Sequence, residues 1–184
     1  MAEGETELKC YVALPGAGPA TVVRARRMIA NPSRAWEPYL PDFSLVMLKG
    51  NTITTASLAG KVVLLDFWAT GCPSCRESVR MVKDIAKHYK GRVKIVGISN
   101  DGNRTAWKTY VAKHHMVWVQ AIDPQFKLGA ELHLEFIPTF IVVGRHGIER
   151  LETDSSGVFG EARIEDAINK ALKQPYPGPA KEKY

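Results

Sequence analysis

The segment that most constrains the fold is an apolar run followed closely by two cysteines. Residues 62–69 are apolar apart from Asp66, which indicates a buried β-strand. Pro73 suits the first turn of a helix, and apolar residues then recur at helical spacing, at Val79, Val82, Ile85, Ala86 and Tyr89. Cys72 and Cys75 are therefore expected between a buried strand and the first turn of a helix.

Strand and helix patterns alternate over the rest of the chain. Gly50-Asn51 and Arg145-His146-Gly147 are hairpin turn signals. Strands are expected at 43–48, 52–54, 93–98, 117–121, 139–143 and 148–152, and helices after Asn103, at 124–132 and at 161–172. This alternation implies an α/β fold with a central β-sheet flanked by helices. The antiparallel hairpin that closes the pattern makes the sheet mixed.

The length of 184 residues suggests one domain with extensions. Pro32, Pro38 and Pro41 lie within ten residues of one another, at the end of a segment, residues 1–40, that we expect to be an N-terminal extension or linker. Residues 41–173 are expected to form the domain, and 174–184 a flexible tail. No apolar run approaches the roughly 18 residues that a membrane span needs, and no signal peptide is visible. The chain is therefore not expected to span a membrane.

The net charge of +6 raises the question of a nucleic-acid partner. The basic residues are spread along the chain, with one local cluster at Arg24, Arg26 and Arg27. A nucleic-acid-binding surface interleaves basic and aromatic residues on one face, and the sequence does not have this pattern. A solvated surface is expected, and a nucleic-acid partner is not.

Cys72-Pro73-Ser74-Cys75 has the C-x-x-C spacing of a redox pair. A sulfur just before a helix lies near unpaired backbone N–H groups and the positive end of the helix dipole, which favour the nucleophilic thiolate. Half of a zinc site is one alternative, but Cys10 is the one further cysteine and the five histidines form no convincing pair. No metal is expected, and an inert pair of thiols stays open as a second alternative.

A second motif, Ile137-Pro138-Thr139, stands at the start of the strand expected at 139–143. A peptide bond before proline can be cis, and a cis bond is a specific feature of tight turns. Taken alone, the motif fits a trans proline at a strand edge better.

Asp66-Phe67-Trp68-Ala69 followed by C-x-x-C resembles the signature of the thioredoxin superfamily. The stretches PDFSL, LAGKVVLLDFWATGCPSCRE, KIVGISND and FIPTFIVVGRHG, in this order, are similar to the TlpA/ResA-like branch and its redoxin relatives. The resemblance covers about residues 41–172. It implies a thioredoxin fold with an N-terminal β-hairpin, and the helix expected at 124–132 fits the short helix that this branch inserts between core strands.

The resemblance also implies roles for individual residues. Cys72 would be the exposed nucleophile and Cys75 the resolving cysteine, with Pro138 cis and packed beside them. The backbone of Ile137 would pair with the extended chain of a substrate, and Trp68 would mainly support the cysteine loop by packing. The candidate substrate-binding residues are Trp68, Gly71, Pro73, Ile137, Pro138 and Thr139.

Asp66 lies six residues before Cys72 and matches the buried aspartate of thioredoxins. Burial without a partner raises the pKa of a carboxyl. Such a group would take the proton of Cys75 through a water during resolution. The alternative is a carboxylate that is satisfied at the strand end and has no catalytic role.

The sequence departs from the family at three positions. Gly71 stands where thioredoxins commonly carry tryptophan, which removes an aromatic contact and widens the groove. Ser78 and Arg80 stand where many TlpA/ResA-like proteins carry glutamate and proline. Glu77 precedes Ser78, but neighbouring helix positions point about 100° apart, so the role of that glutamate is not transferred to it.

The function that the resemblance implies is reduction of disulfides in protein substrates. The chain would be a thiol–disulfide oxidoreductase that needs no metal or organic cofactor besides its redox-active disulfide, Cys72–Cys75. A reductase partner would recharge it. An extracytoplasmic location is favoured on family grounds, and a cytoplasmic one stays open.

Two further functions stay open. A thiol peroxidase of redoxin type shares the fold, but Thr70 lies two residues before Cys72 instead of three, and the proline of the peroxidase motif is missing. The other is a non-catalytic binding module. Copper chaperones with this fold use a wider C-x-x-x-C and a distal histidine, which the spacing here does not match.

Overall fold

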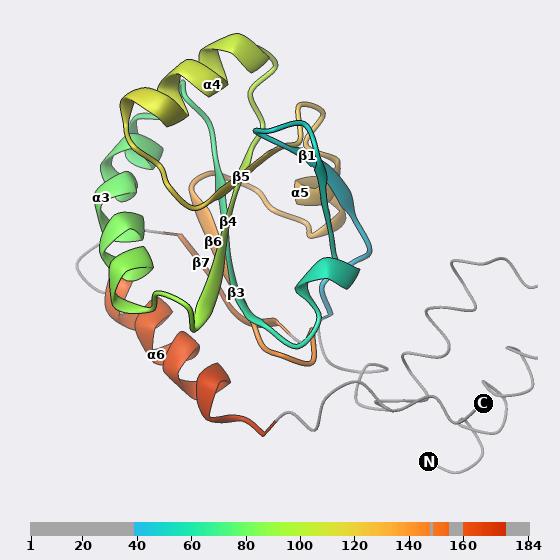
Figure 1. Ribbon diagram of the computed structural model, residues 1–184, viewed down its shortest axis with the longest axis vertical. Helices are drawn as coiled ribbons and strands as arrows, with labels where there is room; N and C mark the ends of the chain where they lie inside the picture. The colour runs from blue at the N-terminus through green and yellow to red at the C-terminus, as the bar shows by residue number, and fades with distance from the viewer. Residues whose placement is uncertain (1–38, 148, 155–159, 176–184) are drawn as a thin grey trace, which may run out of the picture. The chain divides into compact units, whose positions relative to one another are not determined.

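A seven-stranded sheet forms the centre of the part of the chain that this computed structural model describes, residues 39–147, 149–154 and 160–175 (Figure 1). The strands are β1 (Ser44–Met47), β2 (Thr52–Thr54), β3 (Val62–Trp68), β4 (Val93–Ser99), β5 (Val119–Ile122), β6 (Thr139–Val143) and β7 (Glu149–Asp154). Their spatial order is β2-β1-β5-β4-β3-β6-β7. β3, β4 and β5 are parallel, and the other neighbouring pairs are antiparallel. The mixed sheet predicted from the sequence is confirmed.

Helices cover both faces of this sheet. They are η2 (Ala56–Leu58), α3 (Pro73–His88), α4 (Arg104–Lys113), α5 (Lys127–Glu131) and α6 (Gly160–Lys173). Apolar residues of α3, α4 and α6 pack on one face, which we call the α3 face. Apolar residues of η2 and α5 pack on the other, the α5 face. Figure 1 shows α5 on the opposite side of the strands from α3, α4 and α6.

β3 is buried on both faces, which explains its nearly unbroken apolar sequence. The residues on the α3 face are Val62, Leu64 and Trp68, and those on the α5 face are Val63, Leu65 and Phe67. This alternation follows from the period of two in a strand. Asp66 falls between Leu64 and Trp68 in the same series, so its side chain projects to the α3 face.

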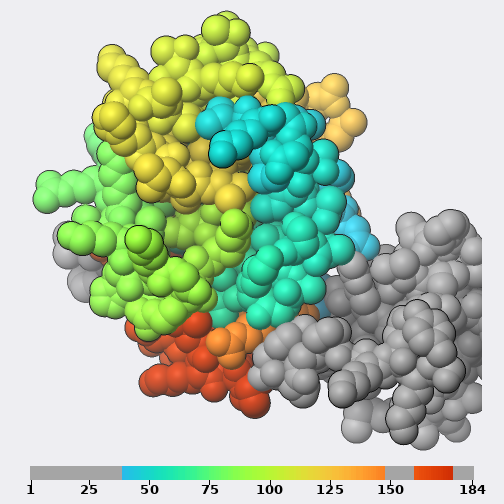
Figure 2. Space-filling view, viewed as in Figure 1, coloured from blue at the N-terminus to red at the C-terminus, as the bar shows by residue number. Residues whose placement is uncertain are grey.

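The hairpin of β1 and β2 closes the β5 edge of the sheet. In the space-filling view the hairpin lies next to α4 on the surface (Figure 2). Val46 and Leu48 pack against the cluster of apolar residues that contains Trp107 of α4. The backbone N–H of Leu48 donates to the carbonyl oxygen of Gln120 at 2.9 Å, which ties the hairpin to β5.

Two predicted boundaries were wrong by a few residues. β5 begins at Val119 and not at 117, and Val117 is 86% exposed. α5 begins at Lys127 and not at 124, because the Asp123 carboxylate accepts the backbone N–H groups of Lys127 at 3.0 Å and Leu128 at 2.8 Å. The side chain that follows β5 thus sets the start of the inserted helix.

Most of the extension expected at 1–40, with Cys10, and of the tail expected at 174–184 lies outside the described residues. Within the described residues, the helices are too short or too polar to cross a membrane.

Candidate active site

The two cysteines of the C-x-x-C segment form a disulfide where α3 begins, with an S–S distance of 2.10 Å. Cys72 is the N-cap residue, and its Sγ accepts the backbone N–H of Cys75 at 3.1 Å. Cys75 is 2% exposed, whereas Cys72 is partly exposed. A reacting partner can therefore reach the sulfur of Cys72 and not that of Cys75.

The first turn of α3 favours a negative charge on the Cys72 sulfur. This turn contains no acidic side chain, and Arg76 follows directly after Cys75 with an exposed side chain. The unpaired N–H groups and the dipole of a helix stabilise an anion at its N-terminus. Once the disulfide is reduced, this environment favours the thiolate of Cys72 over its thiol.

A cis peptide bond between Ile137 and Pro138 places backbone atoms beside the disulfide. The carbonyl oxygen of Ile137 lies 3.7 Å from Cys72 Sγ. Pro138 is buried, and the hydroxyl of Thr139 donates to the carbonyl oxygen of Phe136 at 2.7 Å. The fold thus brings Cys72 and Ile137 together, although 65 positions separate them in the sequence.

Gly71, Pro73 and Phe136 belong to the exposed part of the site. A Cβ added at Gly71 would have no atom within 4 Å, so the position usual for tryptophan is open space here. Phe136 is 52% exposed and directly precedes the residue whose carbonyl approaches Cys72. Phe136 was not among the site residues predicted from the sequence. The available signal was an aromatic residue next to the X-Pro motif.

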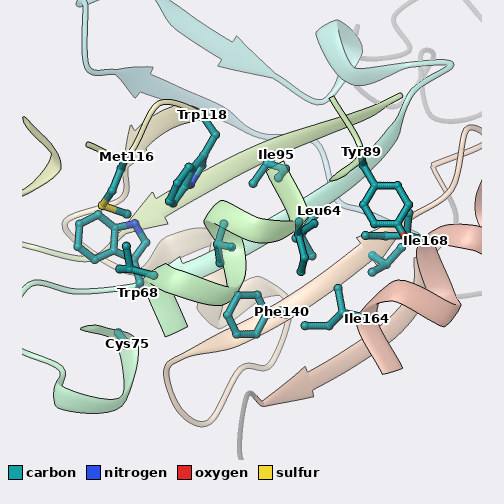
Figure 3. Close-up of a cluster of buried hydrophobic side chains, with 14 of the residues drawn as sticks. Leu64, Trp68, Cys75, Tyr89, Ile95, Met116, Trp118, Phe140, Ile164 and Ile168 are labelled. Carbon is teal, nitrogen blue, oxygen red and sulfur yellow. The ribbon is translucent and has the colours of Figure 1, made fainter. Parts of the chain in front are cut away.

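Trp68 lies beneath the cysteines and not on the surface. It is 2% exposed, and Figure 3 shows it at the same end of the α3-face cluster as Cys75. Its ring packs against Tyr110 with 5.5 Å between centroids, and Tyr110 stacks on His114 at 4.0 Å. Thr139 is equally buried, at 1% exposure. Neither Trp68 nor Thr139 presents its side chain to a substrate, so we expect both to shape the site from below.

Asp66 is a buried carboxyl group on the α3 face. It is 3% exposed, and among the described residues its Oδ1 has no hydrogen-bond partner. Desolvation by burial raises the pKa of this carboxyl from 3.8 to about 7. Cys75 belongs to the cluster on the same face. A carboxyl with a pKa of about 7 can take up or release a proton near neutral pH, and it is therefore suited to exchange a proton with a thiol.

Asp101 ties the loop before the cysteines to the end of β4. Its carboxylate accepts the backbone N–H of Thr70 at 3.0 Å and the hydroxyl of Thr70 at 2.6 Å. It also accepts the hydroxyl of Ser99 at 2.6 Å. These bonds hold the backbone two residues before Cys72. These bonds were not predicted from the sequence, although a Ser-x-Asp sequence at the end of a core strand was a usable signal.

Ser78 occupies the position where the resemblance would place glutamate. It is 7% exposed, and its hydroxyl donates to the carbonyl oxygen of Cys75 at 2.9 Å. Glu77 and Arg80 are exposed. The buried carboxyl that faces α3 is therefore that of Asp66 and not a glutamate of the helix.

The region that contains this site matches known proteins. Residues 60–149 match a family described as thioredoxin-like. Over 108 residues, the chain is 28% identical to the thiol-disulfide oxidoreductase ResA of Bacillus cereus. The match covers 58% of this chain, and it spans 62% of the length of that relative.

Solved structures share the fold. One is a protein of Chlorobium tepidum described as the thiol:disulfide interchange protein DsbE, with a TM-score of 0.69 and 25% identity, covering 74% of this chain and 96% of that one. Another is a thiol-disulfide oxidoreductase from Bacteroides fragilis, with a TM-score of 0.64 and 26% identity, covering 70% of this chain and 98% of that one. The similarity takes in nearly the whole of both solved chains.

Proposed function

Since the chain belongs to the thioredoxin superfamily, on its ResA-like branch, we propose that it is a thiol–disulfide oxidoreductase working through Cys72 and Cys75. The observation that carries this proposal is the disulfide at the start of α3, which has one accessible sulfur beside the Ile137 carbonyl. Residues 41–173 would form the domain that carries the activity.

The exchange proceeds in two steps. In the reduced protein, the Cys72 thiolate attacks a substrate disulfide, forms a bond to one substrate sulfur and displaces the other as a thiolate. The Cys75 thiolate then attacks the Cys72 sulfur, closes the Cys72–Cys75 disulfide and releases the second substrate thiolate. Two electrons pass from the protein to the substrate, whose two thiolates take up protons according to the pH.

Asp66 acts as the base in the second step. Cys75 must lose its proton before it attacks, and its burial keeps bulk solvent away from the sulfur. The Asp66 carboxylate on the same face takes this proton, through a bridging water. The pKa of about 7 supports this role, because the carboxyl changes its protonation state near neutral pH.

The substrate is a protein disulfide presented in an extended chain. The Ile137 backbone, next to the cis bond and 3.7 Å from Cys72 Sγ, supports pairing with such a chain. The open space at Gly71 and the exposed ring of Phe136 support an apolar contact beside the substrate cysteine.

The family supports what we propose for the redox partner, the location and the cofactor requirement. A reductase would restore the dithiol, and the TlpA/ResA-like branch supports reduction on the extracytoplasmic side. The described residues contain no group of three or more His, Cys, Asp or Glu side chains that could hold a metal ion. The proposed reaction uses only the two sulfur atoms and a proton acceptor.

Insulin reduction by the wild type, Cys72→Ser and Cys75→Ser tests the proposal. Wild type should accelerate reduction in the presence of a thiol, and Cys72→Ser should be inactive because it lacks the nucleophile. Cys75→Ser should accumulate a mixed disulfide that mass spectrometry detects. Unchanged activity in Cys72→Ser would contradict the proposal and favour a binding module.

A redox titration against dithiothreitol or glutathione tests the direction. A potential near or below about −250 mV supports a reductase, and a potential above about −150 mV reverses the direction. Rapid turnover of peroxide with a thiol reductant would favour the peroxidase alternative.

A further inference from the structure

A second buried polar side chain lies on the same sheet face as Asp66. Gln120 of β5 is 3% exposed, and neither its Oε1 nor its Nε2 has a hydrogen-bond partner among the described residues. Burying an amide without a partner destabilises a folded protein. The fold therefore retains at position 120 a carboxamide that lowers its stability. The residues around Gln120 indicate what this carboxamide does.

Asp66, Gly97 and Gln120 form a row across three neighbouring strands. Asp66 is in register with Gly97 of β4, and Gly97 is in register with Gln120 of β5. Residues in register on adjacent strands project to the same face of a sheet. The side chains of Asp66 and Gln120 therefore share the α3 face, with Gly97 between them.

The missing side chain of Gly97 makes room for the carboxamide of Gln120. A Cβ added at Gly97 would lie 2.5 Å from Oε1 and 2.8 Å from Nε2 of Gln120. The carboxamide of Gln120 thus lies over Gly97 and extends toward β3. Neighbouring strands are about 4.8 Å apart, so from this place the carboxamide can reach the carboxyl of Asp66 directly or through one water.

We propose that Gln120 is the positioning residue for Asp66, and that its carboxamide binds the carboxyl across Gly97 and holds it toward Cys75. The part of this inference that concerns Cys75 rests on the proposed function. The contact between Asp66 and Gln120 does not depend on it.

A carboxamide suits both states of a carboxyl because it has a donor and an acceptor. While Asp66 is ionised, Nε2 of Gln120 donates to the carboxylate. When Asp66 takes the proton of Cys75, the carboxamide turns and Oε1 accepts the new O–H. One proton moves from the thiol to the carboxyl, and the Cys75 thiolate is left to attack Cys72.

Within the described residues, few other ionisable groups lie on the same face as Asp66. The neighbouring strands contribute Gly97, Gln120 and Phe140 to this row, none of which titrates. The ionisable side chains of the cluster on the α3 face are Cys72 and Cys75, Tyr89 at the end of α3, and Tyr110 of α4. Burial is the cause of the raised pKa of Asp66. A hydrogen bond to the charged carboxylate is stronger than one to the neutral acid, so removing a bound carboxamide should raise that pKa further.

An NMR titration of the reduced protein tests this contact. In the wild type, the side-chain amide resonances of Gln120 should shift with the same midpoint as the carboxyl carbon of Asp66. Asp66→Asn should abolish that shift. Gln120→Leu should raise the Asp66 midpoint by about one unit and slow the second exchange step about tenfold at pH 6, where less Asp66 is then ionised. Val119→Ala, on β5 but on the α5 face, should change neither.

Amide resonances of Gln120 that ignore the Asp66 titration would overturn the proposal, and this wild-type experiment does not depend on any variant folding. An unchanged Asp66 midpoint in folded Gln120→Leu would also overturn it. Shared midpoints in a protein without exchange activity would refute the proposed function and leave the contact standing. Full exchange activity, together with Gln120 resonances that do not follow the Asp66 titration, would refute the contact and leave the proposed function standing.

Discussion

The two faces of the central sheet bury polar groups in different ways. On the α3 face, six side chains carry buried polar atoms that lack a hydrogen-bond partner within the described residues: Asp66, Trp68, Trp107, Tyr110, Trp118 and Gln120. On the side of α5, Asp123 accepts two backbone N–H groups and Thr139 donates to a carbonyl oxygen. The α5 side uses its buried polar groups to fix the backbone, whereas on the α3 face the carboxyl of Asp66 and the amide of Gln120 have no bond to the backbone.

Ser78 and Ser99 show the limit of this contrast. Both are buried on the α3 side, and both have hydrogen-bond partners. Ser78 donates to the Cys75 carbonyl, and Ser99 donates to Asp101, which holds Thr70. Ser78 and Ser99 thus hold the backbone that carries the cysteines. The polar groups of this face that lack hydrogen-bond partners lie beneath that backbone.

The largest expected effect is on the pH dependence of stability. The pKa of Asp66 is about 7 in the folded protein, against its ordinary value of 3.8, so between these values the folded state holds more protons than the unfolded chain. Stability therefore falls as the pH rises through this window, by roughly 4 kcal/mol from this group, and levels off above it. Urea unfolding at pH 4, 6 and 8 measures the fall.

Asp66→Asn provides the control for that measurement. The variant cannot ionise at this position and should lack the contribution of Asp66 to the fall. Equal pH profiles for the variant and the wild type would mean that burial does not raise the pKa of Asp66 in solution.

The next effect concerns the rate of exchange. Asp66→Asn should slow the second step about a hundredfold at pH 8, because general bases contribute about 10² to 10⁴ to such steps. The first step, attack by Cys72, should be unchanged. Stopping the reaction with acid and measuring the mixed disulfide by mass spectrometry separates the two steps. Asp123→Ala, which removes the buried carboxylate of the other side, should leave both rates unchanged.

On the α5 side the expected effect is on stability. Asp123→Ala removes the acceptor for the N–H groups of Lys127 and Leu128. Lost caps of this kind cost about 0.5–2 kcal/mol, and urea unfolding at pH 7 measures the loss. If Asp123→Ala slowed exchange as strongly as Asp66→Asn, the functional contrast between the two sides would be wrong.

The smallest effect is expected at the loop before the cysteines. Thr70→Val removes the hydroxyl that donates to Asp101 and keeps the shape of the side chain. We expect a loss of about 1 kcal/mol and a severalfold slower first step, because the backbone before Cys72 is held less firmly. Thr70→Ser should restore both values in unfolding and single-turnover experiments. A Ser variant as impaired as the Val variant would exclude the hydrogen bond as the cause.

The sequence was most informative where the signals are contiguous. The apolar run of β3, the cysteines and the helix spacing of α3 follow one another, and together they predicted the strand, the helix and the place of the disulfide. Asp66 is the single charge in the same run, and its burial was implied by the resemblance to the buried aspartate of thioredoxins. That Pro138 would lie beside Cys72 followed only from the family resemblance, since no local pattern relates the two segments.

The interactions that the sequence did not predict depend on how strands are aligned. Gln120 and Gly97 are unremarkable in their own segments, and they align with Asp66 only through the register of three strands that are connected by crossovers. Thr70 and Asp101 meet in the same way, at the ends of two parallel strands. The early start predicted for β5 has a simpler reason, because Val117 is apolar but exposed.

Gly97 has a consequence for the history of this chain. Any larger residue there would displace the carboxamide of Gln120, whereas a chain without that amide has no such constraint at position 97. Substitutions at positions 97 and 120 should therefore be correlated among homologues. Glycine at position 97 should accompany glutamine at 120, and a larger residue at 97 should accompany a side chain at 120 that does not lie over position 97. In evolution, a change from glycine and glutamine to the other pair is easier if position 120 changes first, because a larger residue at position 97 then meets no carboxamide.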